Sequence, residues 1–148
     1  MMVFENSDRI PVVGTSRIGT IETTYDTLVK AFGEPTDTGA SLLANGEPPF
    51  YADYEDGDKV TAEWNLAFAV GGGDPEDGGK VEDYVIATVY DYKTGYTPME
   101  EYNWHVGGLM DSQGNNALRF VEARLSEVED EEEVNRRDVK NGLYGDVT

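Results

Sequence analysis

Residues 60–70 read VTAEWNLAFAV, a stretch in which apolar side chains occupy every second position. Alternation with a period of two is typical of a β-strand that buries one face and exposes the other. The stretch therefore predicts a strand of a sheet that has one packed side. The apolar face of this strand consists of Val60, Ala62, Trp64, Leu66, Phe68 and Val70.

Segments on both sides of this strand indicate what packs with it. Residues 84–92 and 102–106 are rich in β-branched and aromatic residues, which favours two more strands. Successive strands most simply pair as antiparallel neighbours. Residues 24–32 carry apolar side chains at helical spacing and end before Gly33, and residues 118–128 repeat that spacing. The sequence thus predicts an α+β fold, an antiparallel sheet of three to five strands with two helices packed on one face.

The expected organisation is one domain over residues 1–128 followed by a tail over residues 129–148. The tail begins with the acidic run EDEEE, whose self-repulsion predicts a flexible segment. Residues 14–19, 36–58 and 71–83 are rich in glycine and are expected to be loops. The expected core contains Leu28, Phe32, Trp64, Leu66, Phe68, Val89, Trp104, Leu118 and Val121.

Charge and composition exclude several classes of function. The 148 residues include 30 Asp and Glu against 11 Lys and Arg, a net charge of −19. This balance argues against direct binding to nucleic acid or to an anionic membrane, because both need a local excess of basic residues. The chain has no cysteine and one histidine, so thiolate metal sites and sites with two imidazoles are excluded. No apolar run is long enough to span a bilayer, which predicts a soluble, cytoplasmic protein.

The sequence predicts neither a metal site nor a cofactor. The acidic stretches at 53–58 and 74–83 lack the third alternating acid of a calcium loop. Residues 14–19 (GTSRIG) have the outer glycine spacing of a phosphate loop but lack the lysine that should follow it.

Tyrosines and carboxylates lie close together in two parts of the chain, residues 53–56 and 90–96. Tyrosine provides a large contact area at low entropic cost, so such places are candidate surfaces for a protein partner. A second candidate site, for a small ligand or a nucleotide, combines Arg17, Trp104 and His105; His105 with a carboxylate would also suit a small hydrolase. The candidate partner-binding residues are Asp53, Tyr54, Glu55, Asp56, Tyr90, Asp91, Tyr92 and Tyr96.

Four segments resemble a group of small bacteriophage proteins. The segments are residues 25–36 (YDTLVKAFGEPT), 58–68 (DKVTAEWNLAF), 87–93 (ATVYDYK) and 102–108 (YNWHVGG). The resemblance implies an early phage accessory protein, a class that often disables a host or defence component. It assigns no activity and no functional residues.

The main hypothesis is a non-enzymatic inhibitor in the host cytoplasm. It would present an acidic, tyrosine-bearing surface to a host or defence protein that has a basic surface. If that protein normally binds nucleic acid, the acidic surface would mimic the nucleic acid. The alternatives are a protein that sequesters a small ligand or nucleotide, and a hydrolase. The sequence is also compatible with a homodimer and with acidity that serves only solubility or a high-salt host.

Overall fold

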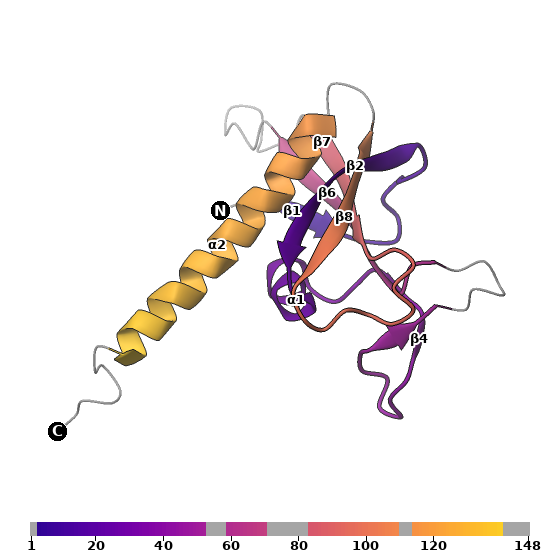
Figure 1. Ribbon diagram of the computed structural model, residues 1–148. Helices are drawn as coiled ribbons and strands as arrows, with labels where there is room; N and C mark the ends of the chain where they lie inside the picture. Colours follow the sequence, from indigo (N-terminus) through magenta and orange to yellow (C-terminus); the bar gives the residue numbers. More distant parts are fainter. Residues whose placement is uncertain (1–2, 53–58, 71–82, 110–113, 141–148) are drawn as a thin grey trace.

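A computed structural model describes residues 3–52, 59–70, 83–109 and 114–140 (Figure 1). The expected loop at 71–83 lies outside these ranges except for residue 83. The end of the expected tail, residues 141–148, also lies outside them.

The described residues form a fully antiparallel six-stranded sheet, which confirms the predicted α+β fold. The strand order is β1-β6-β7-β8-β2, and the short β3 pairs with β6 beside β1. A separate two-stranded sheet pairs β4 with β5. The strands are β1 (Phe4–Asn6), β2 (Thr15–Thr23), β3 (Asp37–Thr38), β4 (Ala40–Ser41), β5 (Phe50–Tyr51), β6 (Ala62–Val70), β7 (Asp83–Tyr90) and β8 (Tyr102–Leu109).

Helix α1 (Tyr25–Phe32) forms where the apolar spacing predicts it. The Thr24 hydroxyl caps its N-terminus by accepting a hydrogen bond of 3.2 Å from the Thr27 amide. At the other end Gly33 has φ of 88°, a left-handed value that favours glycine, and its amide donates to the Val29 carbonyl at 2.8 Å. Both ends of this helix are therefore set by local sequence.

Both helices cover the same face of the sheet, the face that carries the apolar side chains of β6 (Figure 1). The Phe68 ring packs edge-on against Phe32 of α1 and is stacked on Phe120 of α2 (Gly114–Lys140). Trp64 packs edge-on against Trp104 of β8, with ring centroids 5.6 Å apart. All nine predicted core residues belong to this cluster, Leu118 at its half-buried margin.

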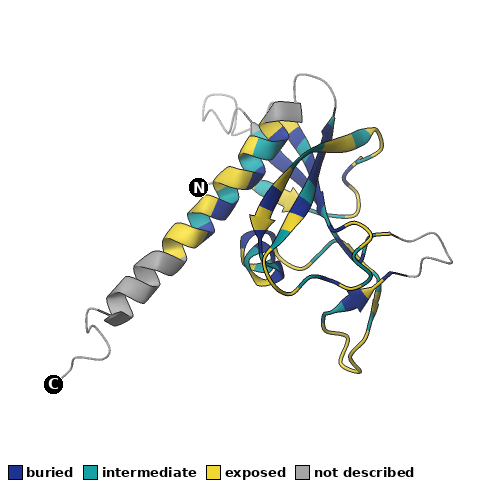
Figure 2. Cartoon of the chain, in the orientation of Figure 1, coloured by how far each residue is buried: buried dark blue, intermediate teal, exposed yellow. Residues whose placement is uncertain are grey.

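Helix α2 extends beyond the domain boundary that the sequence suggests. Its sheet-facing side is buried at Ala117, Val121, Leu125 and Val128, and residues 129–131 are exposed (Figure 2). The helix nevertheless continues to Lys140, so residues 129–140 of the expected tail are helical. The sequence itself offers a reason, since acids at positions 132 and 133 precede arginines by four residues, a spacing that favours a helix.

Residues 15–23 form an edge strand, although residues 14–19 were expected to be a loop. The glycine that suggested a loop has a packing role, because a Cβ at Gly19 would lie 2.9 Å from the Leu118 side chain of α2. The register of β2 against β8 shifts between Arg17 and Gly19, which indicates a β-bulge. The bulge and the glycine interrupt the alternation of apolar and polar residues, so the sequence pattern does not predict this strand.

Candidate functional site

The face of the sheet opposite the helices carries the candidate functional residues. Strand register places Thr20, His105, Tyr90 and Glu63 in one row across β2, β8, β7 and β6, with Asp37 of β3 beside Glu63. Side chains alternate along each strand, so this row lies on the face away from Trp64, Val89 and Trp104. At one end of this face the segment from Arg9 to Pro11 lies beside the sheet, and its buried Ile10 is near Ala67 and Ile86.

Three tyrosines surround the histidine in this row. The His105 ring is stacked on Tyr90 with centroids 5.4 Å apart, and the rings of Tyr92 and Tyr102 lie 5.8 Å and 6.5 Å away. We call Tyr90, Tyr92, Tyr102 and His105 the tyrosine–histidine cluster. Tyr92 is 41 % exposed, and the other three are half-buried. The structure therefore joins residues that the sequence analysis had assigned to two different sites.

The surroundings of the cluster keep its histidine neutral. Partial burial and the nearby Arg17 guanidinium lower the pKa of His105, and the Asp91 carboxylate opposes them. Burial also raises the pKa of Tyr90, against which Arg17 acts in the opposite direction. At the end of the row, burial and then Asp37 raise the pKa of Glu63. At neutral pH the cluster thus offers uncharged aromatic rings beside one guanidinium.

Asp91 does not belong to a partner-binding surface, contrary to the expectation from sequence. Its side chain is fully buried and accepts hydrogen bonds from the Thr61 amide at 2.7 Å, the Ala62 amide at 3.1 Å and the Thr94 hydroxyl at 2.7 Å. The Thr61 hydroxyl also donates to it. These donors hold the start of β6 against the turn after β7, so the role of this carboxylate is structural.

Trp104 is likewise unavailable to a ligand on the open face. It points into the core with 0 % exposure, and its indole nitrogen donates to the Thr23 carbonyl at 3.1 Å. The expected set of Arg17, Trp104 and His105 is therefore wrong in its tryptophan, while Arg17 and His105 do lie together. The Asp91 carboxylate, which lies near His105, is hydrogen-bonded instead to Thr61 and Thr94.

The turn that follows β7 extends the aromatic surface. Tyr96, 60 % exposed, forms a β-bridge with Tyr51, and the Lys93 ammonium lies 5.4 Å from the Tyr92 ring centroid. Asp53, Tyr54, Glu55 and Asp56 lie outside the described residues. The residues that flank them are held by this same turn, since the Ala52 amide donates to the Gly95 carbonyl and the Lys93 amide donates to the Lys59 carbonyl.

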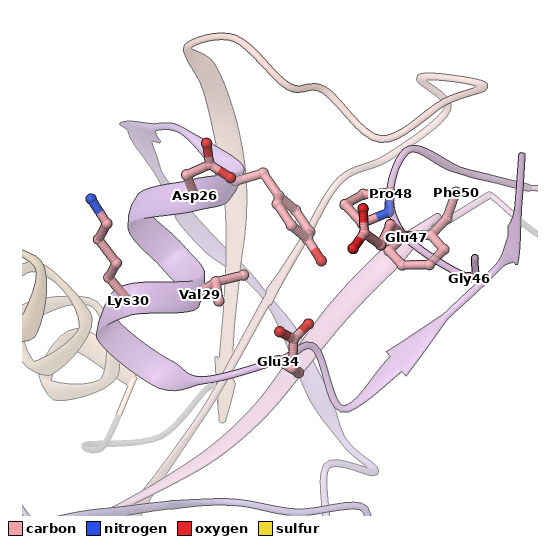
Figure 3. Close-up of a pocket in the computed structure, with 9 residues that line it drawn as sticks. Asp26, Val29, Lys30, Glu34, Gly46, Glu47, Pro48 and Phe50 are labelled. Atoms are coloured by element: carbon pink, nitrogen blue, oxygen red, sulfur yellow. The ribbon is translucent and has the colours of Figure 1, made fainter. Parts of the chain in front are cut away.

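A cavity of about 460 Å³ lies on another side of the molecule, between α1 and the turn that precedes β5 (Figure 3). The cavity could not be predicted from the sequence, because its walls come from segments that are separated along the chain. Glu34 and Glu47 face the space between the helix and the turn, and Lys30 extends away from the turn. The cavity is lined by Tyr25, Asp26, Val29, Lys30, Glu34, Gly46, Glu47, Pro48 and Phe50.

The described residues contain no group of three or more His, Asp or Glu side chains placed to hold a metal ion. None of their helices combines the length and the apolar character that a membrane span requires.

Comparison with known proteins does not place the chain in a family. It matches no protein-family model, no curated protein and no solved structure. The geometry of the site therefore carries the functional argument.

Proposed function

We propose that this protein is a bacteriophage accessory protein that binds and inhibits a host or defence protein with a basic surface. The contact surface would consist of the exposed part of the tyrosine–histidine cluster, Tyr51, Tyr96 and the acidic segment 53–56. A protein that normally binds nucleic acid would offer the basic surface that this arrangement requires.

The observation that carries the proposal is the tyrosine–histidine cluster itself. The rings of Tyr90, Tyr92 and His105 lie on the sheet face that neither helix covers, and the turn after β7 adds the exposed Tyr96. Tyr102 lies at the edge of this group and also packs edge-on against the core residue Trp104, with ring centroids 5.3 Å apart. Tyrosine is among the residues that contribute most to protein interfaces, because it buries a large area while its hydroxyl keeps a hydrogen-bond partner. The apolar faces of the strands are already committed to the core.

Charge supports a basic partner in particular. The net charge of −19 would speed the encounter with a positively charged protein and oppose binding to an acidic one. In the chain the acidic segment lies between Ala52 and Lys59, both of which hydrogen-bond to the turn that bears Tyr92 and Tyr96. Electrostatic attraction and aromatic contact would therefore act at adjoining places.

The proposal is tested by capturing partners with the whole protein from cells that produce it, at low salt, and quantifying them by mass spectrometry. Tyr92→Ala should reduce the recovery of the principal basic protein about tenfold or more, as expected for a tyrosine at the centre of an interface. The matched control is Tyr84→Ala. Tyr84 is 48 % exposed and lies on the same strand face as Tyr90 but at the other end of β7, so its removal should leave recovery unchanged.

Two outcomes would contradict the proposal. In one, the two variants capture the same proteins in the same amounts as the original protein. In the other, the protein recovers no partner and carries a nucleotide when purified, which would favour the alternative of a sequestering protein.

A further inference from the structure

The cavity beside α1 has the construction of a ligand site. One wall is the helix, with Asp26, Val29 and Lys30, and the opposite wall is the turn from Gly46 to Phe50 (Figure 3). Its volume of about 460 Å³ falls within the range of small-molecule sites. Val29, Pro48 and Phe50 give it apolar surface, and Glu34 and Glu47 give it carboxylates.

A buried hydroxyl in this lining has no partner. Tyr25 is 3 % exposed, and its ring packs against Phe50 and Trp64 at centroid distances of 6.5 Å and 5.7 Å. Its hydroxyl oxygen is buried and forms no hydrogen bond with any described residue. An unpaired buried polar group is costly, so such a group in the wall of a cavity indicates that something from outside pairs with it.

The charges around this hydroxyl select the sign of the ligand. The lining contains the three carboxylates of Asp26, Glu34 and Glu47 against the one ammonium of Lys30, a net of −2. Burial, followed by Glu34 and Asp26, raises the pKa of Tyr25 to about 12, so the phenol stays protonated in a negative potential. The net negative charge of the lining would repel an anionic ligand and attract a cationic one.

We propose that this cavity binds an organic cation, a primary ammonium or guanidinium group on a short alkyl stem. The cation donates a hydrogen bond to the Tyr25 hydroxyl oxygen and pairs with the carboxylates of Glu34 and Glu47. The stem packs against Val29, Pro48 and Phe50, and the Tyr25 and Phe50 rings add cation–π attraction.

Two kinds of ligand carry such a cationic group. One is a free alkylamine, and the other is a lysine or arginine side chain of a bound protein. Only the second source rests on the proposed function. In that case the cavity would receive one basic anchor residue of the partner.

The test is titration of the full-length protein, followed by NMR, with n-butylamine, n-butylguanidine and the peptide acetyl-Gly-Arg-Gly-amide. n-Butanol and n-butyrate are the uncharged and anionic controls. We expect the cations to shift the resonances of the α1 and 46–50 segments and the controls to leave them unchanged. Binding of the alkylamine or alkylguanidine supports a free-amine source, and binding of the peptide alone supports a side-chain source.

Variants assign the binding to the cavity. Tyr25→Phe and Glu34→Gln should each weaken binding about tenfold, because each removes one polar contact to the cation. Tyr25→Phe should melt at the same temperature as the original protein or higher, since it loses no hydrogen bond. Glu22→Gln changes an exposed acid on β2 outside the cavity and should bind unchanged.

Equal binding of n-butanol and n-butylamine would overturn the proposal, and so would unchanged affinity in both Tyr25→Phe and Glu34→Gln. Tyr92→Ala should not alter amine binding. A failure of the proposed function, seen as Tyr92-independent capture of proteins, is therefore distinct from a failure of the cation site.

Discussion

Asp91 connects the start of β6 to the turn that follows β7. Its carboxylate accepts four hydrogen bonds, two of them from the backbone amides that begin β6 and one from the turn after β7. The Thr61 hydroxyl in turn lies 2.9 Å from that of Thr97, whose oxygen accepts a hydrogen bond from the Phe50 amide. A single side chain thus connects three segments that are distant in sequence.

Asp91→Ala should lower the free energy of unfolding by about 3 kcal/mol or more, because it leaves two buried amides and two hydroxyls without their acceptor. Urea denaturation followed by tryptophan fluorescence measures the change. The control is Glu101→Ala, which removes an exposed acid directly before β8. It should change the free energy of unfolding by no more than about 0.5 kcal/mol. If both substitutions changed the free energy of unfolding equally, Asp91 would not hold the start of β6 to the turn after β7.

His105 gives a direct reading of the electrostatics on the open face. As the only histidine, it yields an unambiguous NMR titration, and its pKa should lie below the ordinary value of about 6.5. Arg17→Gln should raise that pKa, because the guanidinium disfavours the imidazolium. An unchanged pKa in the variant would mean that Arg17 lies too far away to act.

The same shift makes stability depend on pH. Between the lower pKa of the folded protein and about 6.5, the unfolded chain binds a proton that the folded protein does not. The contribution of His105 to stability is therefore fully present above that window and is lost as the pH falls through it. Urea midpoints measured across this window should fall less in Arg17→Gln than in the original protein.

The long elements with regular patterns could be predicted from sequence. Strand β6 and helix α1 follow from alternation, helical spacing and caps, all of which are local. The two-residue strands β3, β4 and β5 could not, because they exist only through pairing with residues such as Glu63 or each other. The burial of Asp91 could not be predicted either, because Thr61 and Ala62, whose amides donate to it, lie about 30 residues away along the chain.

Trp64 in β6 should be one of the most sensitive core positions. It is fully buried between the rings of Tyr25 and Trp104, and its indole nitrogen donates to the Gly33 carbonyl at 2.9 Å. Trp64→Ala should cost about 3–5 kcal/mol of unfolding free energy, measured by chemical denaturation followed by circular dichroism. A near-neutral result would contradict the packing of the helices on this face.

The distal part of α2 should contribute little to the fold. Val128 is the last residue of the helix that the structure shows to be buried, and Glu129, Asp130 and Glu131 are exposed. Truncation after Val128 should reduce the helical circular dichroism signal but change the melting temperature little. Leu125→Ala is the contrasting control, expected to cost about 2–5 kcal/mol because Leu125 is buried in the core. A large drop in melting temperature on truncation would show that residues beyond 128 pack against the domain.

At the scale of the whole molecule, the two faces of the sheet have separate roles. One face is covered by both helices and holds the core. The other presents Tyr90 and His105 beside Arg17, next to the turn that bears Tyr92 and Tyr96. Composition alone shows that the protein is acidic and rich in tyrosine. The grouping of the tyrosines around His105 needed the strand register, and the cavity beside α1 needed the packing of a turn on a helix.

The most direct test of the proposed function is a salt titration of partner capture by two charge-reversed proteins. One variant carries Asp53→Lys, Glu55→Lys and Asp56→Lys. The control carries Glu129→Lys, Asp130→Lys and Glu131→Lys at exposed positions of α2. Both change the net charge equally, so they differ only in where the charge lies. We expect the first to lose capture about tenfold at low salt and to show a flatter salt dependence, while the control stays near the original protein. Unchanged capture by the first variant, with loss of activity in His105→Ala, would contradict the account and place a ligand site at the open face instead.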